Sequence, residues 1–280
     1  MCLPERAARP DAASSVAPVA SGYERSLRPG LRTSITLRST KEVPPIPPRT
    51  RIAQAHPDRV EVRGRDLAGD LMGRLSFTEY FHLLLTGDEP TEDQRFFLDL
   101  LLVAIAEHGL MPTNVAARMT LAADPGSLHG AVAAGILGAG PVILGASEEC
   151  ARLLVAGGDP KEVVRELRES GRKVPGFGHP VHTPADPRAE RILELADERG
   201  VSARHVAFAR ALRDEVRLTM NVAMPIAAVL LDLGFPAAAV KAVPILGRTA
   251  SLLAHLAEEQ EEPLGFLLAR AAEEAIEYDG

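Results

Sequence analysis

The chain has 280 residues, of which 46% are hydrophobic and only 4% aromatic, with no tryptophan. This length allows one large domain or two smaller ones, and the abundance of Ala and Leu favours closely packed helices over a β-sandwich. The net charge of −7 argues against a general nucleic-acid or membrane-surface binder, because such proteins use Lys and Arg to neutralise phosphates.

The first 30 residues are rich in Ala, Ser, Pro and Arg without a sustained period, which predicts a flexible tail. They lack the apolar core of a secretory signal, and no run approaches the ~20 apolar residues of a membrane span. The two cysteines make no disulfide framework, so we expect a cytoplasmic protein with no membrane contact. Residues 33–40 alternate and are β-prone, but the prolines of residues 44–48 limit this stretch to a short arm.

The next segment changes from a strand-like to a helical pattern. Residues 60–66 are predicted to form a small hairpin or an extended strand. Ser76 and Thr91 then have the residue types and spacing of N-caps, each placed before an apolar periodic run. These signals predict a helix over residues 77–85 and a second helix that follows Thr91, with an apolar stripe over residues 96–106.

Two histidines of this region have different expected environments. His82 lies inside an apolar helix and is predicted to be a packed or surface histidine. His108 stands at a helix end, with Gly109 expected at the C′ position. A histidine there is better exposed to a cleft, and a histidine that only interacts with the helix dipole is the alternative.

The most informative stretch is residues 172–188, Arg-Lys-Val-Pro-Gly-Phe-Gly-His-Pro-Val-His-Thr-Pro-Ala-Asp-Pro-Arg. Its glycines and prolines exclude regular helix, so the backbone must turn tightly and can approach a ligand. His179 follows the turn and Arg188 opens the next helix, which predicts a reacting centre for an anionic substrate. An ordinary connector with a surface histidine is the alternative. We expect His182 at the rim of this loop and His205 on an exposed helix face.

This stretch resembles the Gly-x-Gly-His-x-Val…Asp-Pro-Arg loop of the citrate synthase superfamily, which includes citryl-CoA lyases and the lyase module of ATP-citrate lyase. A weaker similarity extends from about residue 61 to residue 263. The resemblance implies an all-α fold with an active-site cleft between two domains. The large domain would use residues 31–147 and 238–280, and the small domain residues 148–237. A homodimer or higher homo-oligomer is also implied.

The resemblance also implies roles for particular residues. His179 and His108 would be catalytic, while Arg188, Arg248 and Asn221 would bind the oxaloacetate or citryl part of the substrate. The expected partners are a small-molecule carboxylate and a CoA thioester, so coenzyme A or acetyl-CoA is the implied cosubstrate and no metal is needed. The implied CoA contacts are Lys173, Val174, Pro175, Gly176, Phe177 and Gly178.

The chain departs from the family pattern at three positions. Ile143 stands where citrate synthases keep a histidine, as a nonpolar residue does in ATP-citrate lyase, and His129 in the nearby Ser-Leu-His-Gly is predicted to be unrelated to the site. Ala223 stands where the family keeps its catalytic carboxylate. Glu262 replaces an arginine that binds a substrate carboxylate in the family.

These departures leave two functional hypotheses. The first is a citryl-CoA lyase-like or citrate synthase-like enzyme, which makes or cleaves the carbon–carbon bond between an acetyl-CoA-derived thioester and oxaloacetate or a related 2-oxo acid. The second is a catalytically diverged member that binds CoA and a carboxylate without efficient condensation, because Ala cannot replace a positioned acid or base.

Overall fold

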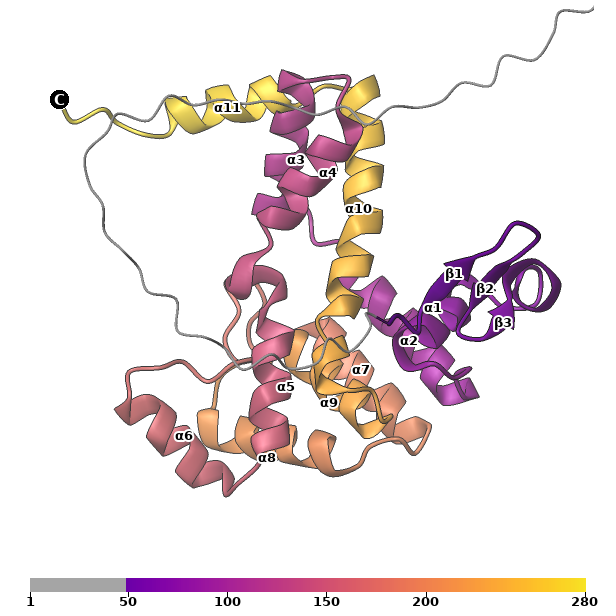
Figure 1. The fold of residues 1–280 in the computed structure, drawn as a ribbon. Helices are drawn as coiled ribbons and strands as arrows, with labels where there is room; N and C mark the ends of the chain where they lie inside the picture. Colours follow the sequence, from indigo (N-terminus) through magenta and orange to yellow (C-terminus); the bar gives the residue numbers. More distant parts are fainter. Residues whose placement is uncertain (1–48) are drawn as a thin grey trace, which may run out of the picture. The chain divides into compact units, whose positions relative to one another are not determined.

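The computed structural model describes residues 49–280, so the predicted tail (residues 1–30) and the predicted short arm (residues 33–40) lie outside the described part. Helices make up 63% of the described residues and strands 4%, which confirms the all-α prediction (Figure 1). In chain order, the elements are β1 (Ala53–Ala55), β2 (Val60–Val62), β3 (Arg65–Asp66), η1 (Leu67–Leu71), α1 (Phe77–Thr86), α2 (Glu92–Ala106), α3 (Pro112–Ala123), α4 (Leu128–Leu137), η2 (Gly140–Leu144), α5 (Ala146–Ala156), α6 (Pro160–Glu169), α7 (Pro187–Glu198), α8 (Arg204–Val216), α9 (Ala223–Asp232), η3 (Ala237–Ala239), α10 (Ala242–Glu261) and α11 (Gly265–Glu274).

The structure contains the hairpin and both helix N-caps that the sequence predicts for its first described residues. Strands β2 and β3 pair antiparallel as the predicted hairpin, and β1 adds a third strand on the other side of β2. Ser76 and Thr91 each accept a hydrogen bond from the backbone three residues on, and the side chain found there bonds back, so both helices begin with a capping box. Gly109 has a φ of +75°, but α2 ends at Ala106 with an extended cap at Glu107, so the predicted C′ position is wrong.

Helix α9 lies at the centre of the main apolar core. Its residues from Ala223 to Leu230 are all buried, and it packs against α2, α5, α7 and α8. A helix that is apolar on every side is stable only when it is enclosed in this way. The first turn of α9 and the segment before it are therefore held in place on several sides.

A second group of helices, α3, α4 and α10, packs around its own smaller core, and α11 packs against α3 (Figure 1). By length and composition alone, the stretch Ala237–Glu261 could cross a membrane, which is an exception to the expected absence of such a run. Core helices of soluble proteins pass the same test. Here α10 packs against α2, α3 and α4 and carries Arg248 and Glu259, both buried in the protein.

Residues 49–280 form one compact unit, and the predicted division into a large and a small domain stays a prediction. The prediction of an exposed His205 is wrong. Its side chain is 13% exposed, and Nδ1 lies 2.7 Å from Oδ1 of Asp232. Asp232, at the end of α9, also accepts the backbone N–H groups of Ala203, His205 and Val206, so it caps α8 and holds the imidazole ring against α9.

Candidate active site

A cavity of about 590 Å³ brings together side chains that are far apart in the sequence. They come from the end of α2, the loop before α7, the starts of α7 and α9, and the middle of α10. All five predicted catalytic and substrate-binding residues line it, together with Lys173, Phe177 and Gly178 of the predicted CoA contacts. The lining includes Ile105, His108, Ile143, Lys173, Phe177, Gly178, His179, Arg188, Asn221, Ala223 and Arg248.

The loop that carries His179 is fixed to the core by its glycine turn. Gly176 has a φ of +80°, and a Cβ atom there would lie 2.8 Å from both the Cys150 sulfur and the Met224 Cβ. Only glycine fits this conformation and this space. Asn221 holds the same turn, since its backbone N–H donates to Gly176 O (2.9 Å) and its side chain donates to Gly178 O (3.0 Å). Asn221 therefore positions the loop as well as lining the cavity.

Hydrogen bonds to His179 determine which of its nitrogens carries the proton. Its Nδ1 accepts the backbone N–H groups of Val181 (3.1 Å) and His182 (2.8 Å). A nitrogen that accepts hydrogen bonds has no proton, so the neutral ring carries its proton on Nε2. His179 is thus a hydrogen-bond donor through Nε2.

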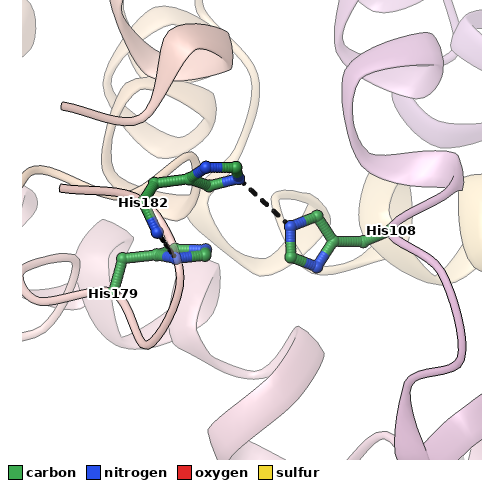
Figure 2. Close-up of side chains that lie close together, drawn as sticks. All are labelled: His108, His179 and His182. Atoms are coloured by element: carbon green, nitrogen blue, oxygen red, sulfur yellow. Dashed lines mark hydrogen bonds between the residues drawn. The ribbon is translucent and has the colours of Figure 1, made fainter.

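His108 and His182 meet the ring of His179, although His182 was expected only at the rim (Figure 2). The Nε2 atoms of His108 and His182 are 3.3 Å apart. Burial, then nearby positive charge including His182 and Arg188, lowers the pKa of both His108 and His179 below the usual 6.5. Both rings are therefore neutral at neutral pH.

The three histidines are close enough to be considered as metal ligands, because one nitrogen from each lies within 4.8 Å of the others. The hydrogen bonds argue for a different arrangement. Nδ1 of His179 is occupied by two backbone donors and Nε2 is protonated, so neither nitrogen offers a lone pair to a metal. The cluster is better suited to proton sharing, and the prediction that no metal is needed stays a prediction.

Two arginines and Lys173 give the cavity its positive charge. Arg188 donates through Nε (3.0 Å) and Nη2 (2.9 Å) to the buried carboxylate of Asp186, which fixes the direction of the guanidinium. Arg248 is 2% exposed and forms no ion pair with any residue of the described chain. Its Nη1 donates to Asn114 Oδ1 (3.2 Å), while its buried Nε has no hydrogen-bond partner within residues 49–280.

Glu107 is a residue of this site that the sequence analysis missed. Its Oε1 accepts the backbone N–H groups of His108 (2.8 Å) and Gly109 (2.6 Å). Its Oε2 accepts the Ser251 hydroxyl and lies 3.0 Å from Nε2 of His255. Ser251 and His255 follow Arg248 at i+3 and i+7, so they lie on one face of α10, and this row of polar side chains was the signal for a polar partner.

We expect Glu107→Gln to lower kcat by up to about 10²-fold, because the amide has one acceptor oxygen and cannot hold both His108 and the Ser251–His255 pair. Steady-state kinetics with the CoA thioester substrate that the sequence resemblance implies test this, and the thermal unfolding midpoint checks that the fold is intact. Glu149→Gln, at an exposed site on α5, is the matched control. Equal kcat values for the two variants would show that Glu107 does not position His108.

A second cavity of about 350 Å³ adjoins the first and shares Lys173, Phe177 and Gly178 with it. Arg168 and Arg172 supply further positive charge at its edge. Of the six predicted CoA contacts, Lys173, Val174, Phe177 and Gly178 line this cavity. Pro175 and Gly176 line neither cavity. Gly176 is instead buried against α5 and α9. CoA contact by any of the six stays a prediction.

Solved structures with the same fold include lyases. The citryl-CoA lyase of Hydrogenobacter thermophilus is 31% identical to this chain, and the match covers 83% of this chain and 94% of the lyase with a TM-score of 0.75. The ATP citrate lyase of Methanothrix soehngenii, solved with citrate and coenzyme A, matches 86% of this chain and 44% of its own with a TM-score of 0.70. At 20% identity, this second likeness shows the fold alone.

Sequence comparisons give the same family. The citrate synthase of Haloferax volcanii is 29% identical over 201 residues, which are 67% of this chain and 52% of the synthase. This chain spans about half the length of the curated relatives that it matches. The model of the family described as "Citrate synthase, C-terminal domain" matches residues 50–270. The chain therefore belongs to the citrate synthase family.

Proposed function

We propose that this chain is a citryl-CoA lyase-like enzyme, which makes or cleaves the carbon–carbon bond between an acetyl-CoA-derived thioester and oxaloacetate or a related 2-oxo acid. The observation that carries this proposal is the buried guanidinium of Arg248. A buried charge without an ion-pair partner is costly, and this one lines a cavity where it donates only to Asn114 and the Ile105 carbonyl and meets no carboxylate of the described chain. A substrate carboxylate would complete its hydrogen bonds.

The second cavity fits a CoA group. Arg168, Arg172 and Lys173 can meet phosphates, and the apolar side chains of Val174 and Phe177 can contact the rest of the nucleotide. Because the two cavities share Phe177 and Gly178, a thioester bound in the second would reach the first. Coenzyme A binds to the ATP citrate lyase structure, and a CoA derivative with oxaloacetate binds to the citrate synthase of Thermoplasma acidophilum, which supports the same ligands here.

The reaction proposed for this site is the cleavage of citryl-CoA to oxaloacetate and acetyl-CoA, or its reverse. In cleavage, the hydroxyl proton leaves, the carbon–carbon bond breaks and the resulting enolate carbon takes up a proton. In condensation, Nε2 of His179 donates its proton to the carbonyl oxygen that becomes the hydroxyl, and the two backbone N–H groups on Nδ1 stabilise the ring until a proton returns from water; cleavage reverses these transfers. Arg248 and Arg188 bind the carboxylates of the oxaloacetate part.

The catalytically diverged alternative rests on a specific feature of the cavity. Ala223 lines it, and no Asp or Glu side chain of residues 49–280 does. A protein with this cavity could bind CoA and a carboxylate while lacking the group that transfers the carbon proton. A homodimer and a cytoplasmic location remain further proposals for either function.

Turnover and binding assays separate the two functions. We expect the purified chain to form acetyl-CoA and oxaloacetate from citryl-CoA. A coupled malate dehydrogenase, which reduces the oxaloacetate, measures this turnover. Ala223→Asp adds a carboxylate to the cavity, and we expect it to raise turnover by about 10-fold or more if the missing acid limits the rate. CoA binding measured by calorimetry without any turnover in either protein would favour the diverged alternative.

A further inference from the structure

Few groups in the large cavity can accept a proton. Its described lining has no carboxylate, which leaves the imidazole rings of His108 and His179. The Nδ1 of His179 accepts two backbone N–H groups and its Nε2 carries the proton. His108 is therefore the neutral lining side chain with a nitrogen lone pair for a carbon-bound proton.

The other nitrogen of His108 faces a second imidazole. In Figure 2 a dashed line joins the rings of His108, from the loop after α2, and His182, from the loop before α7; their Nε2 atoms are 3.3 Å apart. Two such nitrogens form a hydrogen bond when one of them carries a proton and the other does not. When Nε2 of His108 is the donor in this contact, its Nδ1 carries the lone pair and is left for a ligand in the cavity.

The charges around this pair determine where a positive charge is stable. Arg188 at the start of α7 and Arg248 on α10 both lower the pKa of His108, and the carboxylate of Asp186 opposes them. His179 is the other titratable ring in contact with the pair. A proton held on His108 alone would add a further cation to a cavity that Arg188 and Arg248 already make positive. His182 lies between the exposed residues Val181 and Thr183, so a charge there is closer to water.

We propose that His182 is the proton-relay partner of His108 and takes the place of a catalytic carboxylate in this chain. This inference rests on the proposed function. In condensation, Nδ1 of His108 takes a proton from the methyl carbon of acetyl-CoA, and the electron pair of that C–H bond forms the enolate. The proton on Nε2 of His108 passes to Nε2 of His182, which becomes an imidazolium. In cleavage the same transfers run backward, and His182 regains its proton from water.

Deuterium exchange into acetyl-CoA tests the relay. In heavy water with oxaloacetate absent, the chain should catalyse deuterium incorporation into the methyl group, measured by mass spectrometry. His182→Asn keeps a hydrogen-bonding side chain that does not titrate, and His182→Phe keeps a ring, so we expect both to lower the exchange rate and kcat by about 10²-fold. His129→Asn, on the exposed side of α4, is the control. Exchange and kcat at the rate of the control would overturn the proposal.

A histidine titration provides a readout that does not depend on turnover. Nitrogen NMR of the full chain should follow the titration of His108, and His182→Asn should raise the apparent pKa of His108, because His182 is one of the groups that lower it. If the chain has no activity but this shift is present, the proton-sharing pair stands and the proposed function fails. If the chain is active and His108 titrates identically in both proteins, the relay fails and the proposed function stands.

Discussion

Replacing His179 with asparagine is expected to lower the turnover of citryl-CoA by about 10²- to 10⁴-fold. The substitution removes the Nε2 proton that meets the reacting oxygen, while Arg248 and Arg188 stay in place to bind carboxylates. The loss should therefore appear mainly in kcat, with a smaller change in KM. Stopped-flow or coupled assays of citryl-CoA cleavage measure both constants.

The pH profile of the wild-type protein checks the same role. Burial comes first among the causes that hold the pKa of His179 below the usual 6.5, so the ring is neutral at pH 7. Its protonation would place a proton on Nδ1 against the N–H groups of Val181 and His182 and break both hydrogen bonds. We therefore expect kcat/KM to be constant near neutrality and to fall at acid pH, below 6.5. Activity that rises as the pH falls through this range would contradict the assignment, as would His179→Asn with wild-type kcat.

The parts of the site that the sequence predicted are those with local signals. The Gly-Pro turn before His179 and the Asp-Pro-Arg start of α7 determine their own backbone geometry, and their side chains do line one cavity. Arg248 could be placed because the family pattern around it is continuous within one helix. Neither case required knowledge of which helices pack together.

The contacts that were not predicted join segments that are distant in the sequence. His182 is three residues from His179, so it was visible in the loop, but its partner His108 lies 74 residues away, in the loop that follows α2. Glu107 meets Ser251 and His255 across more than 140 residues. A single sequence shows that a residue can titrate or donate, whereas its partner is determined by the tertiary packing.

Breaking the buried ion pair between Arg118 and Glu259 is expected to cause the largest loss of stability of the changes considered. Nη1 of Arg118 donates to Oε2 of Glu259 at 2.9 Å, and the two side chains are 1% and 2% exposed. Glu259 also accepts the backbone N–H groups of Leu264 and Gly265, so it caps the start of α11. Removing one member of such a pair leaves a buried charge and typically costs about 3–5 kcal/mol.

We therefore expect Glu259→Leu to lower the free energy of unfolding by about 3–5 kcal/mol, measured by urea denaturation at neutral pH. Glu258→Gln is the matched control, since Glu258 also contacts Arg118 but its side chain is 58% exposed, and such pairs contribute about 0–1 kcal/mol. The double variant Arg118→Met with Glu259→Leu should recover part of the loss, because it removes the unpaired charge. A single variant as stable as the control would show that the pair contributes little.

Acid titration gives the same pair a second test. Burial raises the pKa of Glu259, but the hydrogen bonds from Gly265, Leu264 and Arg118 outweigh it and hold the pKa below the usual 4.5. A carboxyl group whose pKa is depressed in the folded state stabilises the fold above its unfolded pKa, and this contribution is lost as the pH falls through the folded value. The stability gap between wild type and Glu259→Leu should therefore be constant above about pH 5 and shrink at lower pH.

Because His255 contacts both Arg118 (3.1 Å) and Glu107 (3.0 Å), loss of the pair should also lower kcat, since it loosens the face of α10 that carries Arg248.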